Sequence, residues 1–368
     1  MIDSTYKILF ELLRISLDGK CDANRTPLQL SLEQWEKLYH EAKRQSVLDV
    51  VFTVISKLTK EELPPKPVLM RWAFHAEMNR LMNKKINEEA ARLTEIFRKA
   101  GRRTAVLKGA ANARLYPDPF SRQCGDIDLW VEGGRKSVET LLMDLKMMPE
   151  HVDQVSQHHI HFPKNEDGII LEVHFKPASG NPFKNGELQK FLNKEILKSE
   201  LVPEGFYAPS IKFALVMQLS HLQQHFYSRG LGLRQYMDYC ILLRCSTETD
   251  RKEAFAVMNS LYMRKACGAV MWVLEKVFGL DRELMLCAPD EWRGKRLLQL
   301  AMEGGNFGQF SQNRSKRMNV FVRWFKDRMC ALRWIPFDPV NVLFKELRYW
   351  KATLSLIPLR IKRRKIAL

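Results

Sequence analysis

Two aspartates, Asp126 and Asp128, lie one residue apart in the segment DIDLWV. Polar and apolar residues alternate at its start, which is typical of a β-strand, and residues two apart on a strand project from the same face. Two carboxylates on one face repel each other unless a cation lies between them. A magnesium ion suits such a site because it prefers a few oxygen ligands and leaves room for substrate phosphates. A D-x-D pair alone also fits a solvated strand edge or turn, so its surroundings decide between these interpretations.

A third carboxylate, Glu172, lies in the segment IILEVHF at residues 169–175. The odd-numbered residues of this segment are apolar, while Glu172 and His174 share the opposite face. A polar pair on an otherwise buried strand needs a reason, and facing the aspartate pair would be one. We therefore expect Asp126, Asp128 and Glu172 to be the catalytic carboxylates and to bind Mg²⁺ or Mn²⁺.

The strand that precedes Glu172 is rich in histidine. Residues 158–162 read HHIHF, and an Asp-Gly turn signal at 167–168 joins them to the Glu172 strand as a β-hairpin. His159 and His161 share one face, so they could line the same cleft as acid–base or phosphate-contacting groups. Packing or solvent exposure is the alternative. Metal binding by these histidines would need ligands that converge from more than one element.

Lys108 and Gly109 follow a short apolar, strand-like run at residues 104–107 and precede a helical segment. Backbone N–H groups at the start of a helix can bind phosphate, and glycine allows close approach of the ligand. Lys108 and Arg122 can also meet the charge of a phosphate directly. We therefore expect this region to bind a phosphorylated ligand.

Strands and helices are expected to alternate around these residues. Strands are expected at 104–107, 126–131, 158–162 and 169–175, and helices at 110–116 and 137–148. The first hundred residues have helical spacing, with a capping-box signal at Ser31 and Gln34 and a long helix over 68–100 that ends at Gly101. From residue 211 onward the spacing is again helical. The sequence therefore predicts a compact α/β unit between two helical segments.

The composition favours an anionic partner. The 368 residues include 59 Lys and Arg against 42 Asp and Glu, a net charge of +17. Such a surplus favours nucleotides, nucleic acid or an anionic membrane surface, although it also fits a basic surface that serves only solubility. The seven cysteines are odd in number and form no C-x-x-C pair, which argues against a disulfide framework and a structural zinc site and favours a reducing, cytoplasmic location. We find no signal peptide and no apolar run long enough to span a membrane.

The basic residues are concentrated in the segment 314–365, together with Trp324, Trp334 and Trp350. Basic residues interleaved with aromatic ones fit binding to RNA or to an anionic membrane surface. They also fit an ordinary helical lobe with buried aromatic side chains and a solvated basic face. An RNA acceptor is the functional use that we favour.

Two residue pairs with helical i, i+4 spacing follow the α/β unit. His221 and His225 share one helix face, and so do Arg234 and Asp238. The spacing alone predicts two partly buried histidines and a surface ion pair.

The combined motifs resemble a known family. The segment LKGAANARLYPDPFSRQCGDIDLWV, with the later HHIHF and LEVHF segments, is similar to the uncharacterised nucleotidyltransferase family of the DNA polymerase β-like superfamily. The resemblance covers residues 104–175. Its matching residues are Leu107, Lys108, Gly109, Arg122, Gly125, Asp126, Asp128, Glu172 and His174. The usual Gly-Ser turn is replaced by Gly109 and Ala110, so the serine hydroxyl that would contact a nucleotide phosphate is missing.

The resemblance implies an α+β fold with a small mixed β-sheet. We expect this nucleotidyltransferase core at residues 102–205, an N-terminal helical lobe at 1–101 and a basic C-terminal helical lobe at 206–368. The resemblance also implies that a helix carrying Arg234 and Asp238 closes over the core.

The activity that the resemblance implies is metal-dependent transfer of a nucleoside monophosphate from an NTP, such as ATP, to an acceptor. The acceptor could be RNA, a protein or a small molecule. Lys108, Gly109, Arg122 and Gly125 would bind the nucleotide. The alternative is a non-catalytic scaffold of the same fold that binds RNA or an anionic surface.

Overall fold

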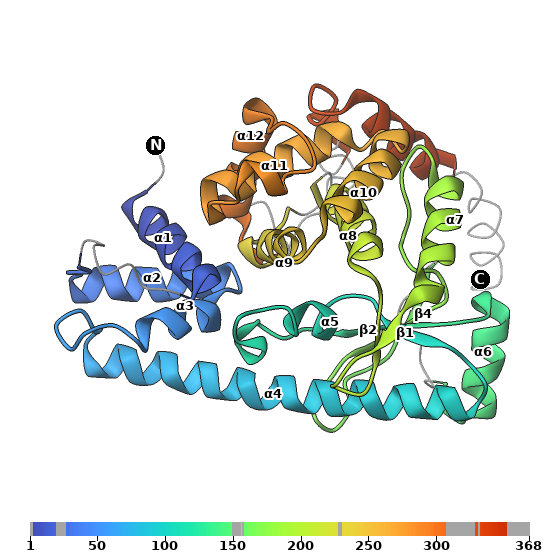
Figure 1. The fold of residues 1–368 in the computed structure, drawn as a ribbon, viewed down its shortest axis with the longest axis horizontal. Coiled ribbons are helices and arrows are strands. Elements are labelled where there is room, and N and C mark those ends of the chain that lie inside the picture. The colour runs from blue at the N-terminus through green and yellow to red at the C-terminus, as the bar shows by residue number, and fades with distance from the viewer. Residues whose placement is uncertain are drawn as a thin grey trace, which may run out of the picture.

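The structure is a computed structural model of the chain. It describes residues 3–19, 27–148, 156, 158–226, 230–306, 328–329 and 332–351. Helices surround one small sheet (Figure 1). The expected α+β class is confirmed, because the described residues form a four-stranded mixed sheet, a two-stranded ribbon and many helices.

The helices that precede the sheet in the described part of the chain are α1 (Ser4–Asp18), α2 (Leu32–Arg44), α3 (Leu48–Ile55) and α4 (Lys66–Lys99). The predicted capping box is present at α2, where the Ser31 hydroxyl accepts from the Gln34 N–H and the Gln34 side chain accepts from the Ser31 N–H. Helix α4 begins two residues earlier than predicted. Gly101 follows its C-cap with a φ of 71°, the left-handed geometry that glycine favours after a helix.

The central sheet contains β1 (Thr104–Val106), β2 (Ile127–Val131), β3 (His159–His161) and β4 (Leu171–His174). Their order is β1-β2-β4-β3. Strand β2 is antiparallel to β1 and parallel to β4, and the predicted hairpin of β3 with β4 is confirmed. The sheet is therefore mixed, as expected, and its central strands are the two that carry the predicted carboxylates.

Some predicted elements differ in extent. The helix expected over 110–116 is only α5 (Ala110–Ala113), because its last residues form tight i, i+3 turns ahead of Pro117. The helix expected over 137–148 is α6 (Gly134–Asp144). Helix α7 (Asn185–Glu195) and the ribbon of β5 (Glu200–Leu201) with β6 (Tyr207–Ala208) were not predicted. Strands of two residues are too short to show alternation.

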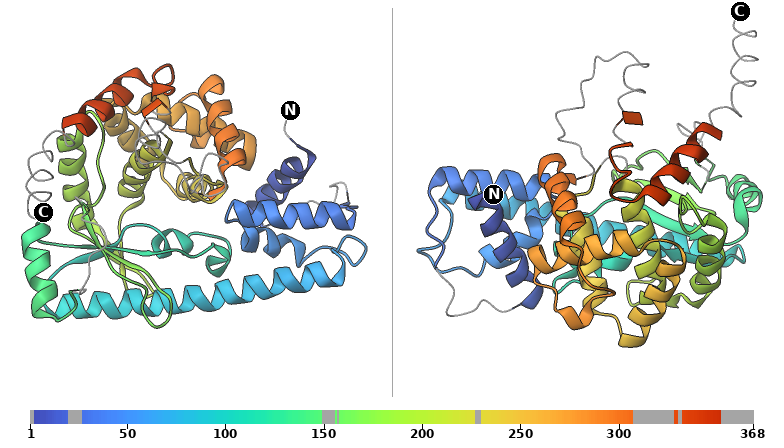
Figure 2. Two further views of the ribbon diagram at one scale, coloured as in Figure 1. Left: turned by 180° about the vertical axis from the view of Figure 1, so that it is seen from behind. Right: turned by 90° about the horizontal axis from the view of Figure 1, so that it is seen from above.

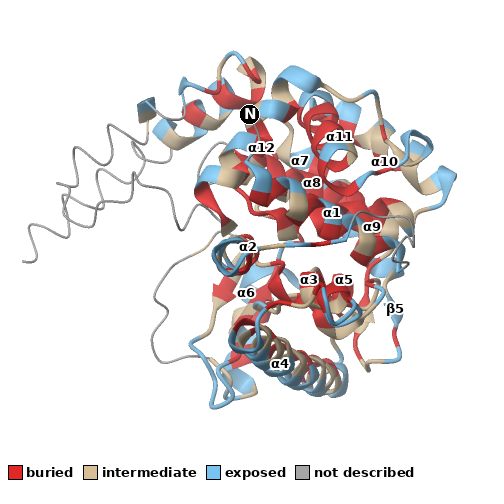
Figure 3. Ribbon diagram, turned by 90° about the vertical axis from the view of Figure 1, so that its left-hand side faces the viewer, coloured by how far each residue is buried: buried red, intermediate tan, exposed pale blue. Residues whose placement is uncertain are grey.

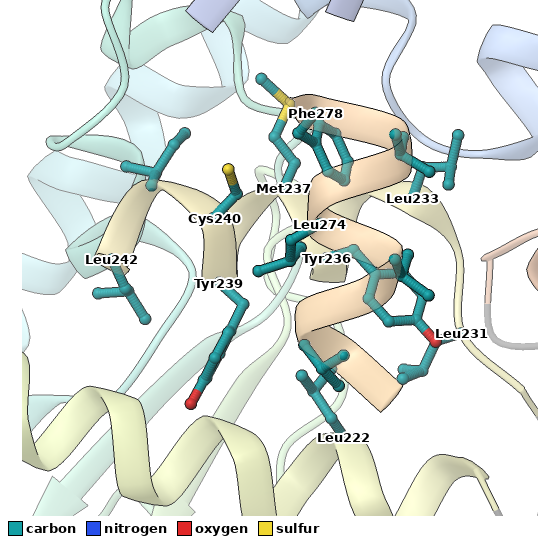
Figure 4. Packing of buried hydrophobic residues seen from close by; sticks show 14 of the residues in the cluster. Leu222, Leu231, Leu233, Tyr236, Met237, Tyr239, Cys240, Leu242, Leu274 and Phe278 are labelled. Atoms are coloured by element: carbon teal, nitrogen blue, oxygen red, sulfur yellow. The ribbon is translucent and has the colours of Figure 1, made fainter. Parts of the chain in front are cut away.

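The later part of the chain is helical, as expected. It contains α8 (Ile211–Phe226), α9 (Leu233–Arg244), α10 (Glu248–Ser260), α11 (Arg264–Phe278) and α12 (Glu291–Gly304), and residues 339–351 are also helical. Short 3₁₀ turns occur at Pro119–Ser121, Ile196–Lys198 and Arg282–Leu284. Helix α9 is buried on nearly every side, and its Leu233 and Tyr236 belong to the same hydrophobic cluster as Leu274 and Phe278 of α11 (Figure 4).

Buried hydrophobic side chains form two clusters. The larger one joins α1–α3 to α8, α9 and α11, and the smaller one joins the sheet to the second half of α4 and to α6. The sheet lies between α4 on one side and α8–α12 on the other (Figures 1 and 2). Burial is concentrated in α8, α9 and α11, whereas α4 exposes one side to solvent (Figure 3). The division into lobes at residues 101 and 205 stays a prediction.

The basic C-terminal segment is described only in part. Trp334 is buried and Trp350 is exposed, whereas Trp324 and the basic cluster at residues 360–365 lie outside the described residues. Among the residues that the structure describes, no helix is long and apolar enough to cross a membrane.

Candidate active site

The strand register brings the predicted acidic residues together. In the parallel pairing of β2 with β4, Asp128 is the direct neighbour of Glu172. In the antiparallel pairing of β3 with β4, His161 is opposite Glu172 and His159 is opposite His174. Because direct neighbours in a sheet share a face, these side chains lie together on one face of the sheet, across three strands. Asp126 precedes β2 by one residue.

The carboxylates differ in exposure. The Asp128 side chain is 1% exposed, whereas that of Asp126 is 38% exposed. His174 connects Asp128 to Glu172, because its Nε2 lies 3.1 Å from Asp128 Oδ1 and 3.3 Å from Glu172 Oε2. Burial acts to raise the pKa of Asp128, but the charge of Lys108 and the hydrogen bond of His174 outweigh burial and lower it. Burial lowers the pKa of His174, but its hydrogen bonds to both carboxylates prevail and raise it.

Lys108 lies against the aspartates. Its Nζ is 2.6 Å from Asp128 Oδ2 and 3.8 Å from Asp126 Oδ1. Burial would lower the pKa of Lys108, but the nearby Asp126 and Asp128 raise it above its ordinary value. Gly109 follows with a φ of 65°, and a Cβ at this position would lie 3.2 Å from the backbone oxygen of Asp126. Gly109 therefore allows the β1–α5 turn to lie against the start of β2, and the expected close approach of a phosphate to Gly109 stays a prediction.

Arg122 is already paired inside the protein. It forms two hydrogen bonds of 2.8 Å with the carboxylate of Asp238 on α9, and Tyr116 Oη donates to the same carboxylate at 2.7 Å. Arg122 and Asp238 are both 5% exposed. The expected surface ion pair between Arg234 and Asp238 is therefore wrong. Helix α9 is buried on nearly every side, so its i, i+4 spacing does not mark a solvated face.

Arg234 has another role in the structure. Its Nη1 donates to the backbone oxygens of Gln123 and Cys124, at 3.1 and 3.2 Å, immediately ahead of Gly125. Asp238 holds Arg122 at the other end of this short loop. Helix α9 thus positions the segment that leads into β2, and both residues of the predicted pair contribute to it.

Two asparagines that sequence reasoning missed hold the same loop from the side of α4. Asn79 and Asn83 each donate to the backbone oxygens of Phe120 and Arg122, and Asn79 Oδ1 accepts from the Cys124 N–H. Both are 5% exposed. A signal was available, because asparagine is a poor helix former and three of them, Asn79, Asn83 and Asn87, recur at intervals of four within one long helix.

Lys108, Gly109, the three acidic residues and the histidines of β3 and β4 line one wall of a cleft of about 820 Å³. The opposite wall comes from α8, α9 and the helical residues 339–351. It includes Gln218, His221, His225, Arg234, Lys345 and Arg348. His221 and His225 face each other with their Nε2 atoms 3.1 Å apart, and burial followed by the charge of His225 lowers the pKa of His221 well below its ordinary value. The expectation that both histidines are partly buried is confirmed.

The described side chains could hold a cation in two groups: Asp128, Glu172 and His174, or His158, His159 and His174. In each group the donor atoms lie within 4.8 Å of one another. The first group contains two of the three expected carboxylates. Asp128 Oδ2 is buried against the Lys108 ammonium at 2.6 Å, so a cation bound by this group would compete with Lys108 for the carboxylate. The predicted ligand Asp126 lies at the exposed edge of this group.

The chain belongs to a nucleotidyltransferase family. The family model described as "Uncharacterised nucleotidyltransferase" matches residues 31–279, about two thirds of the chain. The match extends beyond the motif segment and spans α2 to the end of α11, so it includes the loop-holding helices α4 and α9.

Comparisons with curated sequences and with solved structures do not narrow the function further. No curated protein sequence matches the chain. Among solved structures, the chain is similar to an antigenic nucleotidyltransferase-like protein from Paracoccidioides brasiliensis, with 15% identity and a TM-score of 0.32. The alignment covers 53% of this chain and 92% of that one. A similarity at this level carries no conclusion about function.

Proposed function

We propose that the protein transfers a nucleoside monophosphate from an NTP to an acceptor hydroxyl in the cleft beside β2 and β4. The observation that carries this proposal is the placement of Asp128 and Glu172 as direct neighbours on adjacent strands, with Asp126 two residues before Asp128. Family membership supports the same class of reaction. The large cleft offers space for both a nucleotide and part of an acceptor.

Asp126, Asp128 and Glu172 would hold Mg²⁺ or Mn²⁺, which would neutralise phosphate charge and activate the attacking oxygen. Lys108, Gly109 and Gly125 would contact the triphosphate from the β1–α5 turn and the entry to β2. Arg122 is hydrogen-bonded to Asp238, so its role would be to position the loop ahead of β2. It would contact the nucleotide directly only where the phosphates replace Asp238 as its partner. Arg234, Lys345 and Arg348 supply further positive charge from the opposite wall.

In the transfer step, the acceptor oxygen forms a bond to the α-phosphorus of the NTP. The bond from that phosphorus to the bridging oxygen breaks, and pyrophosphate leaves with its electron pair. The acceptor proton passes to Glu172. His161 lies 3.4 Å from Glu172 Oε1 with a side chain 38% exposed, so it can pass the proton on to solvent. Most of the rate gain would come from positioning and charge neutralisation.

The test uses the full chain with each of four α-labelled NTPs and Mg²⁺. Total cellular RNA, protein extract and a small-metabolite extract serve as separate acceptor sources. We expect label to enter one of these fractions, and to disappear with Asp126→Ala and Asp128→Asn. Glu166→Gln is the matched control, because Glu166 is exposed in the β3–β4 turn, and it should retain transfer. Absence of label with every nucleotide and acceptor would contradict the proposal.

A non-catalytic scaffold is the second candidate, and two observations favour it. Ala110 replaces the usual serine of the turn, and the Lys108 ammonium lies directly against Asp128. Such a protein would bind RNA through its basic surface. This binding would survive EDTA and Asp126→Ala but fall steeply as salt rises.

A further inference from the structure

Three histidine rings meet beside the carboxylates. His159 on β3 is opposite His174 on β4, and His158 immediately precedes β3. The ring centroids of His158 and His159 are 4.3 Å apart, and those of His159 and His174 are 5.0 Å apart. One nitrogen from each ring lies within 4.8 Å of one nitrogen of each of the other two. The rings come from two strands, so they meet the requirement that metal ligands converge from different elements.

His174 has one occupied and one unoccupied nitrogen. Its Nε2 is used by Asp128 and Glu172, whereas its Nδ1 is buried and has no hydrogen-bond partner among the described residues. Nδ1 of His159 is also buried without a hydrogen bond, and its nearest carboxylate oxygen, Glu172 Oε2, is 3.6 Å away. Buried polar atoms are normally satisfied, so two such nitrogens in one place indicate a missing ligand.

The remaining contacts orient the rings for binding. Nδ1 of His158 lies 3.0 Å from the hydroxyl of Ser156. If this nitrogen donates to the hydroxyl, Nε2 of His158 keeps its lone pair. In the same way, a hydrogen on His174 Nε2 that points to Asp128 leaves the lone pair of Nδ1 available. Outer contacts of this kind fix the tautomer and direction of metal-binding histidines in proteins.

We propose that His158, His159 and His174 bind a zinc-class divalent ion in a second site beside the carboxylates. Imidazole nitrogens favour zinc and its first-row neighbours, whereas magnesium prefers oxygen ligands. Three protein ligands leave a coordination position open, and His158 and His159 both line the cleft. The open position therefore faces the space that a substrate would occupy. His174 belongs to both groups, so the ion would also fix the orientation of Asp128 and Glu172.

The test measures bound metal rather than turnover, so its failure leaves the transfer reaction untouched. The full chain is stripped with a chelator and dialysed against Zn²⁺ in the presence of excess Mg²⁺, and the metal retained per chain is measured. We expect one zinc per chain for the wild type and for Asp126→Asn. His158→Gln and His159→Gln should each lose it. Retention of zinc by both histidine variants, or no zinc on the wild type, would overturn the proposal.

A cysteine substitution reports the position of the ion even if glutamine variants fold poorly. With Co²⁺ as the probe, His158→Cys should give a thiolate-to-cobalt charge-transfer band, because cysteine still ligates. His161→Cys is the matched control, since His161 lies two residues along β3 and outside the three-histidine group. A band in the control and not in His158→Cys would place the ion among the carboxylates and overturn the assignment.

Discussion

Lys108 is the cation that contacts Asp128, and its charge lowers the pKa of that carboxyl against the opposing effect of burial. Its Nζ lies 2.6 Å from the 1% exposed side chain of Asp128. Removal of one partner from such a pair leaves an uncompensated buried charge, which is far more costly than the net stabilisation that the intact pair provides. The same ammonium occupies space next to the carboxylates that a metal ion would approach.

Lys108→Met should therefore lower the free energy of unfolding by about 3 kcal/mol. Added Mg²⁺ should recover part of this loss in the variant and stabilise the wild type less, because the ammonium no longer competes for Asp128. Denaturant unfolding with and without Mg²⁺ measures both effects. Lys84→Met is the control, since Lys84 is exposed on α4 and should change little. Equal effects of the two substitutions would show that Asp128 does not depend on Lys108.

Asp49 gives a pH-dependent prediction away from the site. It is 3% exposed in the first turn of α3, and burial raises its pKa from 3.8 to about 7. The folded state therefore holds its proton more tightly than the unfolded chain does, so stability falls as pH rises from about 4 to about 7. Asp49→Asn removes this loss, which amounts to as much as about 4 kcal/mol.

The free energy of unfolding of Asp49→Asn should thus rise progressively relative to that of the wild type between pH 4 and pH 8. Chemical denaturation of both proteins at each pH measures this difference. Asp144→Asn, at an exposed position at the end of α6, should show a difference that does not vary with pH. A gain of the same size at pH 4 and pH 8 would mean that Asp49 ionises normally in the fold.

At the scale of elements, the loop between Ser121 and Ile127 is held by two helices that are far apart in sequence. Asn79 and Asn83 of α4 donate hydrogen bonds to the backbone oxygens of this loop, and Arg234 of α9 does the same. The backbone hydrogen bonds of the sheet begin only at Ile127. Ahead of Ile127, the side chains of the two helices provide the hydrogen bonds that a strand partner would otherwise provide.

Asn79→Ala should lower the free energy of unfolding by about 2 kcal/mol, because the Cys124 N–H loses its acceptor and the loop oxygens each lose one of two donors. Asn87→Ala is the control on the same helix, and its side chain is only partly buried. Thermal unfolding of both variants checks the difference. If Asn79→Ala is as stable as Asn87→Ala, water satisfies the loop and α4 does not hold it.

Local patterns predicted the strands of Asp128 and Glu172 well, but they did not predict the residues that support these strands. Alternation placed Asp128 and Glu172 on strands, and the turn signal paired β3 with β4, because these features depend on neighbouring residues. The parallel pairing of β2 with β4, and the loop contacts of Asn79 and Asp238, join residues far apart in sequence. An i, i+4 spacing on a helix looks the same in the sequence whether that helix face is buried or solvated. For this reason the spacing of Arg234 and Asp238 was misinterpreted as a surface ion pair. The predicted roles in nucleotide and metal binding remain predictions.

At the scale of the whole molecule, the pair of Arg122 with Asp238 connects the part of the chain that carries the sheet to the helical part that forms the other wall of the cleft. Arg122 belongs to the loop ahead of β2, and Asp238 belongs to α9, whose apolar residues lie in the larger cluster. The charge of Arg122 lowers the pKa of Asp238 against the opposing effect of burial. This charged pair therefore acts together with the apolar contacts of Ala105, Leu107 and Trp130 in the larger cluster to place the sheet against the helical part.

Asp238→Asn should cost about 3–5 kcal/mol, since Arg122 then stays buried without a counter-charge. Arg122→Met should cost a similar amount, but the double variant should cost clearly less than the sum of the two, because it leaves neither charge unpaired. Equilibrium unfolding of the four proteins measures this coupling. The exposed pair of Arg244 with Asp18 is the control, where Asp18→Asn should cost no more than about 1 kcal/mol. If the effects of the Arg122 and Asp238 substitutions simply add, the two residues do not hold the loop against α9, and the position of α9 over the cleft depends on its apolar contacts with α11.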